Sequence, residues 1–235
     1  NETIYSNAPF RDIAWGLAEQ GIASIRYDKR YYTYPDKAVE LNNAVTIDDE
    51  VLSDVYAAID LAKTDGRVDG ERIFVLGHSL GGMLTPAIAA KHPELAGVIS
   101  MAGTLRPLYE VSYDQTIETV QSLRPTLSEQ ELAILDAQLA QIEADMEMLR
   151  DLPTNPTLDA DTTLLGIPAI YWYSLEQYEG EKYLEQISMP MLILQGEADF
   201  QIYADVDYPL WQEKLADRDN VVFHLYPGLN HLMMP

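Results

Sequence analysis

The sequence predicts an α/β fold: a mostly parallel sheet flanked by helices, with a helical cap inserted between two strands. Helical and strand patterns alternate along the chain up to Gly103, which is typical of a parallel sheet with helical crossovers. The pattern then becomes mostly helical, without a convincing buried strand, and strand patterns resume near the C-terminus. We therefore expect residues 1–103 and 189–235 to form the core and residues 104–188 to form the inserted cap.

Hydrophobic spacing predicts each element of the core. In residues 10–20 and 46–63, apolar side chains recur at every third or fourth position, which predicts amphipathic helices. Short apolar runs rich in β-branched and aromatic residues predict buried strands of a parallel sheet. These runs span residues 22–27, 72–76, 97–101, 191–195 and 221–226, and a third helix is predicted over residues 79–91.

The clearest element of the cap is a long helix that begins at Ser128. Ser128 and Glu131 form the pattern of a capping box, in which the hydroxyl accepts the backbone N–H of the glutamate and the carboxylate accepts that of the serine. The apolar residues of this helix predict a narrow seam, formed by Leu132, Leu135, Leu139, Ile142, Met146 and Leu149. We expect the seam to pack within the chain, with a coiled-coil dimer as the alternative. The helix is expected to end at the proline-rich stretch 151–156.

An aromatic-rich stretch follows in residues 168–180. Within it, Tyr171, Trp172 and Tyr173 are candidates for contact with a substrate. Packing in the core is the preferred interpretation of this stretch, because large aromatic side chains dominate core packing, and contact with a substrate is the alternative. If the inserted region covers a site, these side chains would form part of the pocket wall.

The composition and the short motifs exclude several functions. Among the 235 residues, 38 acidic and 15 basic side chains give a net charge of −23. No nucleic-acid partner is expected, because phosphate binding needs clustered Lys and Arg. The chain has no cysteine, which excludes disulfides, thiolate metal sites and a cysteine nucleophile. We find no apolar run of transmembrane length and no metal-binding or nucleotide-binding pattern, so we expect a soluble protein that uses neither metal nor cofactor.

A glycine-rich turn supplies a candidate nucleophile. The residues Gly77-His78-Ser79-Leu80-Gly81-Gly82 directly follow a predicted strand and open a predicted helix. In such a sharp turn the serine side chain projects from the sheet, and we expect a Cβ at Gly77 or Gly81 to collide with its neighbours. The N–H of Leu80, at the positive end of the helix, is the candidate oxyanion donor. An ordinary β–α turn without a chemical role is the alternative.

Four histidines are candidates for the base that a serine nucleophile needs. His231 is preferred, because it lies in a turn-rich loop after the last predicted strand, where the sites of open α/β sheets gather. His78 adjoins the nucleophile and is expected to point away from its Oγ. His92 ends a helix and His224 lies inside a strand, so neither is placed for this role.

A third group must orient the base. Asp199 lies in the loop directly after the predicted strand 191–195 and is the candidate, with Glu197 in the same loop as its competitor. Along the chain, the order Ser79, Asp199, His231 is the nucleophile, acid, base order of the α/β-hydrolase fold.

These motifs resemble those of α/β-hydrolases over nearly the whole chain. More narrowly, the chain resembles bacterial esterases and acyl hydrolases related to the dienelactone-hydrolase group. Four segments carry this resemblance: Asn1-Glu2-Thr3-Ile4, Pro9-Phe10-Arg11-Asp12, Ala14-Trp15-Gly16-Leu17-Ala18 and Arg26-Tyr27-Asp28-Lys29-Arg30. The resemblance implies hydrolysis of carboxylic esters through an acyl-enzyme, with a cap over the acyl pocket.

We therefore expect a serine esterase whose partner is a small-molecule ester with a small or medium acyl group. A thioesterase or a peptidase with the same three residues is the alternative, and so is a non-catalytic binding protein that retains the fold. No oligomeric state is predicted.

The ends of the chain depart from the family pattern. In the enzymes that it resembles, strands and a loop with a second oxyanion donor come before the segment that opens here, and a helix follows the histidine. We find neither, so we expect the sequence to be part of a longer bacterial protein, either cytoplasmic or secreted.

Overall fold

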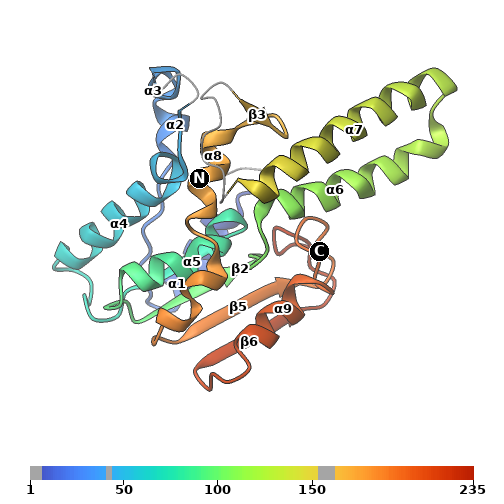
Figure 1. Ribbon diagram of the computed structural model, residues 1–235. Helices are drawn as coiled ribbons and strands as arrows, with labels where there is room; N and C mark the ends of the chain where they lie inside the picture. Colours follow the sequence, from blue (N-terminus) through green and yellow to red (C-terminus); the bar gives the residue numbers. More distant parts are fainter. Residues whose placement is uncertain (1–6, 41–43, 153–161) are drawn as a thin grey trace.

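The computed structural model describes residues 7–40, 44–152 and 162–235. Its centre is a four-stranded parallel sheet with the strand order β1-β2-β5-β6 (Figure 1). The strands are β1 (Phe74–His78), β2 (Gly97–Met101), β5 (Met191–Gly196) and β6 (Val221–Tyr226). The predicted α/β class and parallel sheet are confirmed.

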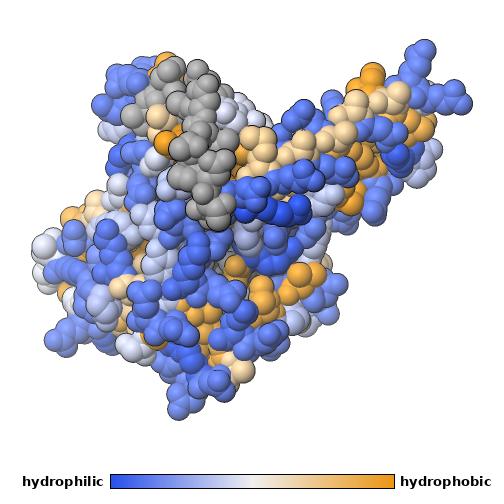
Figure 2. Space-filling view, in the orientation of Figure 1, coloured by the Kyte–Doolittle hydropathy of each residue, from blue (hydrophilic) through white to orange (hydrophobic). Residues whose placement is uncertain are grey.

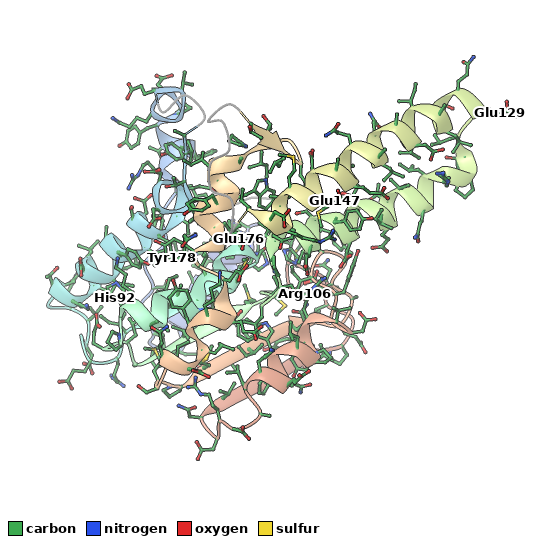
Figure 3. All side chains as sticks on the ribbon, in the orientation of Figure 1. His92, Arg106, Glu129, Glu147, Glu176 and Tyr178 are labelled. Carbon is green, nitrogen blue, oxygen red and sulfur yellow. The ribbon has the colours of Figure 1, made fainter. Side chains whose placement is uncertain are left out.

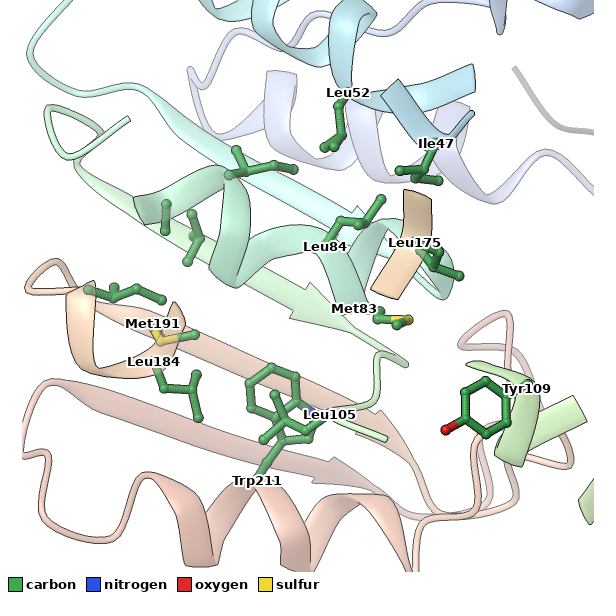
Figure 4. Packing of buried hydrophobic residues seen from close by; sticks show 14 of the residues in the cluster. Ile47, Leu52, Met83, Leu84, Leu105, Tyr109, Leu175, Leu184, Met191 and Trp211 are labelled. Atoms are coloured by element: carbon green, nitrogen blue, oxygen red, sulfur yellow. The ribbon is translucent and has the colours of Figure 1, made fainter. Parts of the chain in front are cut away.

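One face of this sheet is the core face. The strand register places Val75, Val98, Met191 and Val221 in one row across the sheet, and the helix α5 (Leu80–Lys91) belongs to the same buried cluster. Figure 4 shows Met83 and Leu84 of α5 packed toward residues of the neighbouring helices. The sheet covers one side of α5 and other helices cover its outer side, so residues 82–89 are all buried. A helix buried on all sides has to be apolar almost all round, which explains the composition of α5.

Further helices surround this centre. They are α1 (Pro9–Glu19), α2 (Arg30–Thr33), α3 (Pro35–Glu40), a π-helical turn (Asp48–Leu52) that continues into α4 (Ser53–Thr64), and α9 (Asp207–Lys214). The helices predicted over 10–20, 46–63 and 79–91 are confirmed, with their ends shifted by a few residues.

The strand predicted for residues 22–27 is wrong. This segment has no regular structure, and Ile22 and Ile25 are 52% and 49% exposed. A strand exists only when its backbone groups pair with a neighbour. Within the described residues, β1 pairs only with β2 and no strand pairs with this segment. The apolar pattern alone therefore does not produce a strand here.

The first part of the insertion is a helical arm. It consists of α6 (Leu108–Leu123), a 3₁₀ turn (Arg124–Thr126) and α7 (Glu129–Asp151), and it projects from the body of the molecule (Figure 1). The predicted capping box is confirmed: Ser128 N–H donates to Glu131 Oε2 at 2.8 Å, and Glu131 N–H donates to Ser128 Oγ at 3.4 Å. The helix α7 contacts α6, and the seam residues Leu135, Leu139 and Ile142 line the groove between the two helices. Met146 and Leu149 of the seam are buried in the core, so the seam has contacts within the chain, and the coiled-coil dimer remains the alternative. Residues 153–156 of the predicted proline-rich stop lie outside the described residues.

The second part of the insertion returns to the core. It contains a short antiparallel hairpin, β3 (Thr163–Leu164) with β4 (Ile167–Pro168), then α8 (Ala169–Glu176) and a 3₁₀ helix (Gly180–Gln186). The described part of the insertion thus holds two short paired strands that the sequence pattern did not predict, and Leu164 of β3 is buried.

An ion pair joins the insertion to the core at its first turn. Asp207, at the start of α9, accepts hydrogen bonds from Thr104 Oγ1 at 2.5 Å and from Arg106 Nε at 3.0 Å. A second carboxylate, Asp114 of α6, binds the same guanidinium at 2.6 Å. Arg106 thus lies where the base of the arm meets the sheet (Figure 3), and its two carboxylate partners connect α6 of the arm with α9 of the core.

The surface is mostly hydrophilic, with apolar residues along the arm (Figure 2). A groove of about 500 Å³ runs between α6 and α7 and is lined on the α7 side by Leu135, Leu139 and Ile142. No helix within the described ranges is long and apolar enough to cross a membrane.

Candidate active site

Ser79 occupies a strained turn between β1 and α5. Its backbone has φ 56° and ψ −119°, a conformation that residues with a Cβ rarely adopt and that often marks a functional site. Two backbone hydrogen bonds hold the turn: Ser79 N–H donates to Met101 O at 2.9 Å, and Met83 N–H donates to Ser79 O at 2.9 Å. Both the neighbouring strand and the helix therefore keep the serine at the carboxyl end of the sheet.

The two glycines that flank Ser79 have different roles. A Cβ on Gly77 would lie 2.0 Å from the carbonyl oxygen of Gly81, so position 77 tolerates no side chain. A Cβ on Gly81 would meet nothing within 4 Å. The predicted steric need for glycine therefore holds at 77 and is wrong at 81.

Leu80 is the first residue of α5. The first N–H groups of a helix have no carbonyl partner within the helix and carry its partial positive charge. Leu80 directly follows Ser79 in the chain, so its N–H is one of these free donors and lies next to the candidate nucleophile. Its role in catalysis stays a prediction.

Asp199 and His231 form a buried pair. His231 Nδ1 lies 3.0 Å from Oδ1 and 2.9 Å from Oδ2 of Asp199, and both side chains are almost fully buried. Backbone N–H groups of Gln201 and Ile202 donate to Asp199 Oδ1 at 2.8 and 2.9 Å. When Nδ1–H donates to the carboxylate, the lone pair of Nε2 is available to accept a proton, which is the arrangement a general base needs.

Gln195 is a site residue that the sequence analysis missed. Its side-chain Nε2 donates to Asp199 Oδ2 at 2.9 Å and to the carbonyl of Ile202 at 3.0 Å. Both oxygens of the Asp199 carboxylate thus accept hydrogen bonds from groups other than His231. A signal was present: this buried glutamine follows four apolar residues in β5, and a buried amide needs partners.

The loop after β6 carries His231 back across the sheet. Ala198 N–H donates to Leu229 O at 2.9 Å, which ties this loop to the end of β5. A Cβ on Gly196 would lie only 2.3 Å from the same carbonyl, so the loop passes directly over the glycine. Asn230 closes the turn, since its Oδ1 accepts the N–H of Leu232 at 2.9 Å.

His78 links the serine turn to this loop. Its Nε2 lies 2.7 Å from the carbonyl oxygen of His231, and the two rings are 4.8 Å apart. The sequence pattern does not predict this contact. Because Ser79 is the next residue, the contact places His231 beside the serine turn, although no hydrogen bond joins Ser79 Oγ to His231 Nε2 in the part of the chain that the structure describes.

The competing candidates lie elsewhere. Glu197 is exposed and accepts the N–H of Gly228 at 3.1 Å. His92 lies at the far end of α5, where its Nδ1 is 2.9 Å from Glu94. His224 is exposed on β6.

The three aromatic candidates of the cap lie on α8. Trp172 is only 2% exposed, and its Nε1 donates to Leu164 O at 2.9 Å. The hydroxyl of Tyr171 donates to Glu50 at 2.5 Å. Tyr173 is 37% exposed. Their contact with a substrate stays a prediction.

A parallel sheet, a strained serine before a buried helix, and an Asp–His pair on later loops together define an α/β-hydrolase. The chain belongs to the family described as serine aminopeptidase, S33, whose model matches residues 6–235. It is 35% identical over 234 residues to Esterase EstD of Thermotoga maritima. That match covers 100% of this chain and 51% of the relative, so the chain spans about half the length of the curated relative it matches.

Solved structures show the same fold. Est1E from Butyrivibrio proteoclasticus is similar with a TM-score of 0.56 and 15% identity, over 99% of this chain and 77% of that chain. The metagenome-derived lipolytic enzymes LipS and LipT give a structure that is similar with a TM-score of 0.53 and 20% identity, over 97% of this chain and 82% of that chain. At such identities the likeness shows the α/β-hydrolase fold alone.

Proposed function

We propose that the protein is a serine esterase that cleaves small or medium carboxylic esters through an acyl-enzyme, with Ser79, His231 and Asp199 as its catalytic triad. The observation that carries this proposal is the buried Asp199–His231 pair beside the strained turn of Ser79. The relative named as an esterase supports the choice of an ester as the bond that is cleaved.

In this proposal each residue has a defined step. His231 Nε2 takes the proton of Ser79 Oγ as the oxygen attacks the ester carbonyl, and Leu80 N–H donates to the oxyanion that forms. His231 then gives the proton to the leaving alkoxide. A water molecule, activated by the same nitrogen, hydrolyses the acyl-enzyme and releases the acid. Asp199 keeps Nδ1 of the imidazole protonated and oriented throughout.

We also propose that residues 104–188 form the cap over residues 1–103 and 189–235, with Tyr171, Trp172 and Tyr173 near the acyl group. The ion pair of Arg106 with Asp207 supports this division, because it lies at the start of the insertion. Of the three aromatic side chains, Tyr173 is the most exposed and therefore the first to test.

A peptidase is the second candidate, because the family description names an aminopeptidase. The triad hydrolyses esters, thioesters and peptides by the same steps. A panel of p-nitrophenyl esters, acyl thioesters and aminoacyl p-nitroanilides distinguishes these, using the whole protein that contains this chain. We expect the largest kcat/KM for an ester, and a larger value for an anilide would overturn the choice of bond.

Labelling with a fluorophosphonate tests the catalytic role directly. The wild type is expected to form one adduct that is lost in Ser79→Ala. Asp199→Asn should keep the fold and lower kcat by roughly 10⁴-fold, since the wrong imidazole tautomer is then favoured. Glu197→Gln is the matched control and should stay near the wild type. An unlabelled wild type would instead support a non-catalytic binding protein.

A further inference from the structure

The side chain of His78 connects two parts of the candidate site that are far apart in sequence. It lies at the end of β1, one residue before Ser79, and it reaches the loop that carries His231, 153 residues later in the chain. Its Nε2 is 2.7 Å from the backbone carbonyl oxygen of His231. The neighbouring contacts involve Leu229 and Asn230. The contact of His78 is with the backbone of His231, the residue whose side chain is the candidate base.

We propose that His78 is a positioning residue: its Nε2–H donates to the carbonyl of His231 and fixes the base loop relative to Ser79. This inference rests on the proposed function. The imidazole of His231 is then held at two points, with its ring bound by Asp199 and its backbone bound by His78. The backbone contact sets where the ring starts, and the carboxylate sets its rotation.

The chemistry of the contact assigns the proton on His78. A carbonyl oxygen only accepts hydrogen bonds, so Nε2 of His78 carries the hydrogen. That nitrogen therefore has no lone pair to offer to Ser79 Oγ, so Nε2 of His78 does not compete with His231 as a base.

The ring of His78 is itself held in place. Phe10 of α1 meets it edge-on, with ring centroids 5.4 Å apart, and the ring of His231 lies 4.8 Å away on a 49° tilt. An aromatic contact of this geometry restricts rotation about the side-chain bonds. The donor thus points at the carbonyl before a substrate arrives, which is what a positioning role needs.

Two substitutions separate the hydrogen bond from the packing. His78→Phe keeps an aromatic ring against Phe10 and removes the donor, whereas His78→Gln keeps an N–H donor at the end of the side chain. We expect His78→Phe to lower kcat by about 10- to 100-fold with KM within about twofold, because a small displacement of the base affects the transition state and not substrate binding. His78→Gln should recover activity to within about threefold of the wild type.

The matched controls are His224→Phe and His224→Gln. His224 is an exposed histidine of the same sheet, and both variants should leave kcat unchanged. In a His231→Ala background, His78→Phe should cause no further loss of residual activity, because the group that it positions is gone. A further loss of tenfold or more, or equal losses in the Phe and Gln variants, would overturn the proposal.

The ring nitrogens of His78 provide a readout that does not depend on activity. In ¹⁵N NMR of the wild type, Nε2 of His78 is expected to be the nitrogen that bears hydrogen, and its signal should be slow to exchange. An Nε2 without hydrogen would overturn the hydrogen bond even if the variants did not fold. A wild type that fails to label at Ser79 would remove the proposed function, and this spectrum would still decide the contact of His78 with His231.

Discussion

Gly196 is the position at which one added methyl group should disturb the candidate site most selectively. A Cβ there would lie 2.3 Å from Leu229 O and 2.7 Å from Asn230 O, where ordinary contact begins at 3.4 Å. Both oxygens belong to the backbone directly before His231, so the loop must move by about 1 Å to accept the methyl group. The Nδ1–carboxylate distances of 2.9 and 3.0 Å would then exceed hydrogen-bonding range.

From this displacement we expect Gly196→Ala to lower kcat by about 100-fold and the free energy of unfolding by about 1–3 kcal/mol. The assays are ester turnover, the rate of fluorophosphonate labelling, and urea unfolding. Gly16→Ala is the matched control, because a Cβ at this exposed position of α1 meets nothing within 4 Å. It should keep activity and gain up to about 1 kcal/mol in stability. If Gly196→Ala were labelled by the fluorophosphonate at the wild-type rate and had the wild-type stability in urea, the predicted displacement of the His231 loop would be wrong.

Three further predictions follow from the described contacts. Gly77→Ala should cost about 3 kcal/mol or more in urea unfolding, because its Cβ would lie 2.0 Å from a backbone oxygen, whereas Gly81→Ala should cost nothing; equal costs would contradict the geometry of the turn. Burial, the hydrogen bond with Glu179 and the charge of that neighbour raise the pKa of Glu176 from 4.5 to about 8. The folded state then holds a proton that the unfolded state has released, so the free energy of unfolding should fall as the pH rises from 4.5 to about 8, with a slope of up to about 1.4 kcal/mol per pH unit. Glu176→Gln should remove that fall, and an unchanged pH dependence of urea unfolding would refute the assignment. Ser128→Ala should lower the stability of the arm by about 1 kcal/mol through loss of the cap, measured by hydrogen exchange along α7, and unchanged exchange there would count against the cap.

Local patterns predicted most elements of the fold. The capping box at Ser128 specifies the start of α7 through two bonds between residues three positions apart, and such bonds depend on little else. The strand 97–101 was predicted at its observed bounds, because a run that is apolar on both faces suits only a buried position in the sheet.

Residues 22–27 show where local patterns fail. Ile22, Ile25 and Tyr27 have the composition of a strand, yet the segment is irregular and these side chains are exposed. Pairing with another strand is a tertiary property, and a single segment carries no record of whether its partner is present. The same limit explains why the short β3–β4 hairpin was missed.

The same limit applies to the candidate site: its local motifs can be predicted from the sequence, whereas contacts between distant segments cannot. The glycine-rich turn, the chain order and the loops that follow strands predict Ser79, Asp199 and His231, and all three are features of the sequence. The structure brings Asp199 and His231 together and places His231 against His78. The contacts of Gln195 and His78 arise only when the strands align, so a residue-by-residue reading of the sequence assigned them no role.

The strand order places Ser79 and His231 after the two edge strands of the sheet, β1 and β6. Three strand intervals separate β1 from β6, roughly 14 Å at ordinary spacing, so the side chain of His231 reaches the serine turn only because its loop crosses back over β5. Gly196 permits the crossing and His78 holds its end, and both act through the same histidine. Substitutions that move or misorient His231 should therefore be non-additive with one another. In an Asp199→Asn background, Gly196→Ala should cost much less activity than its expected 100-fold or so in the wild type, because a base that is already misoriented loses little by being moved.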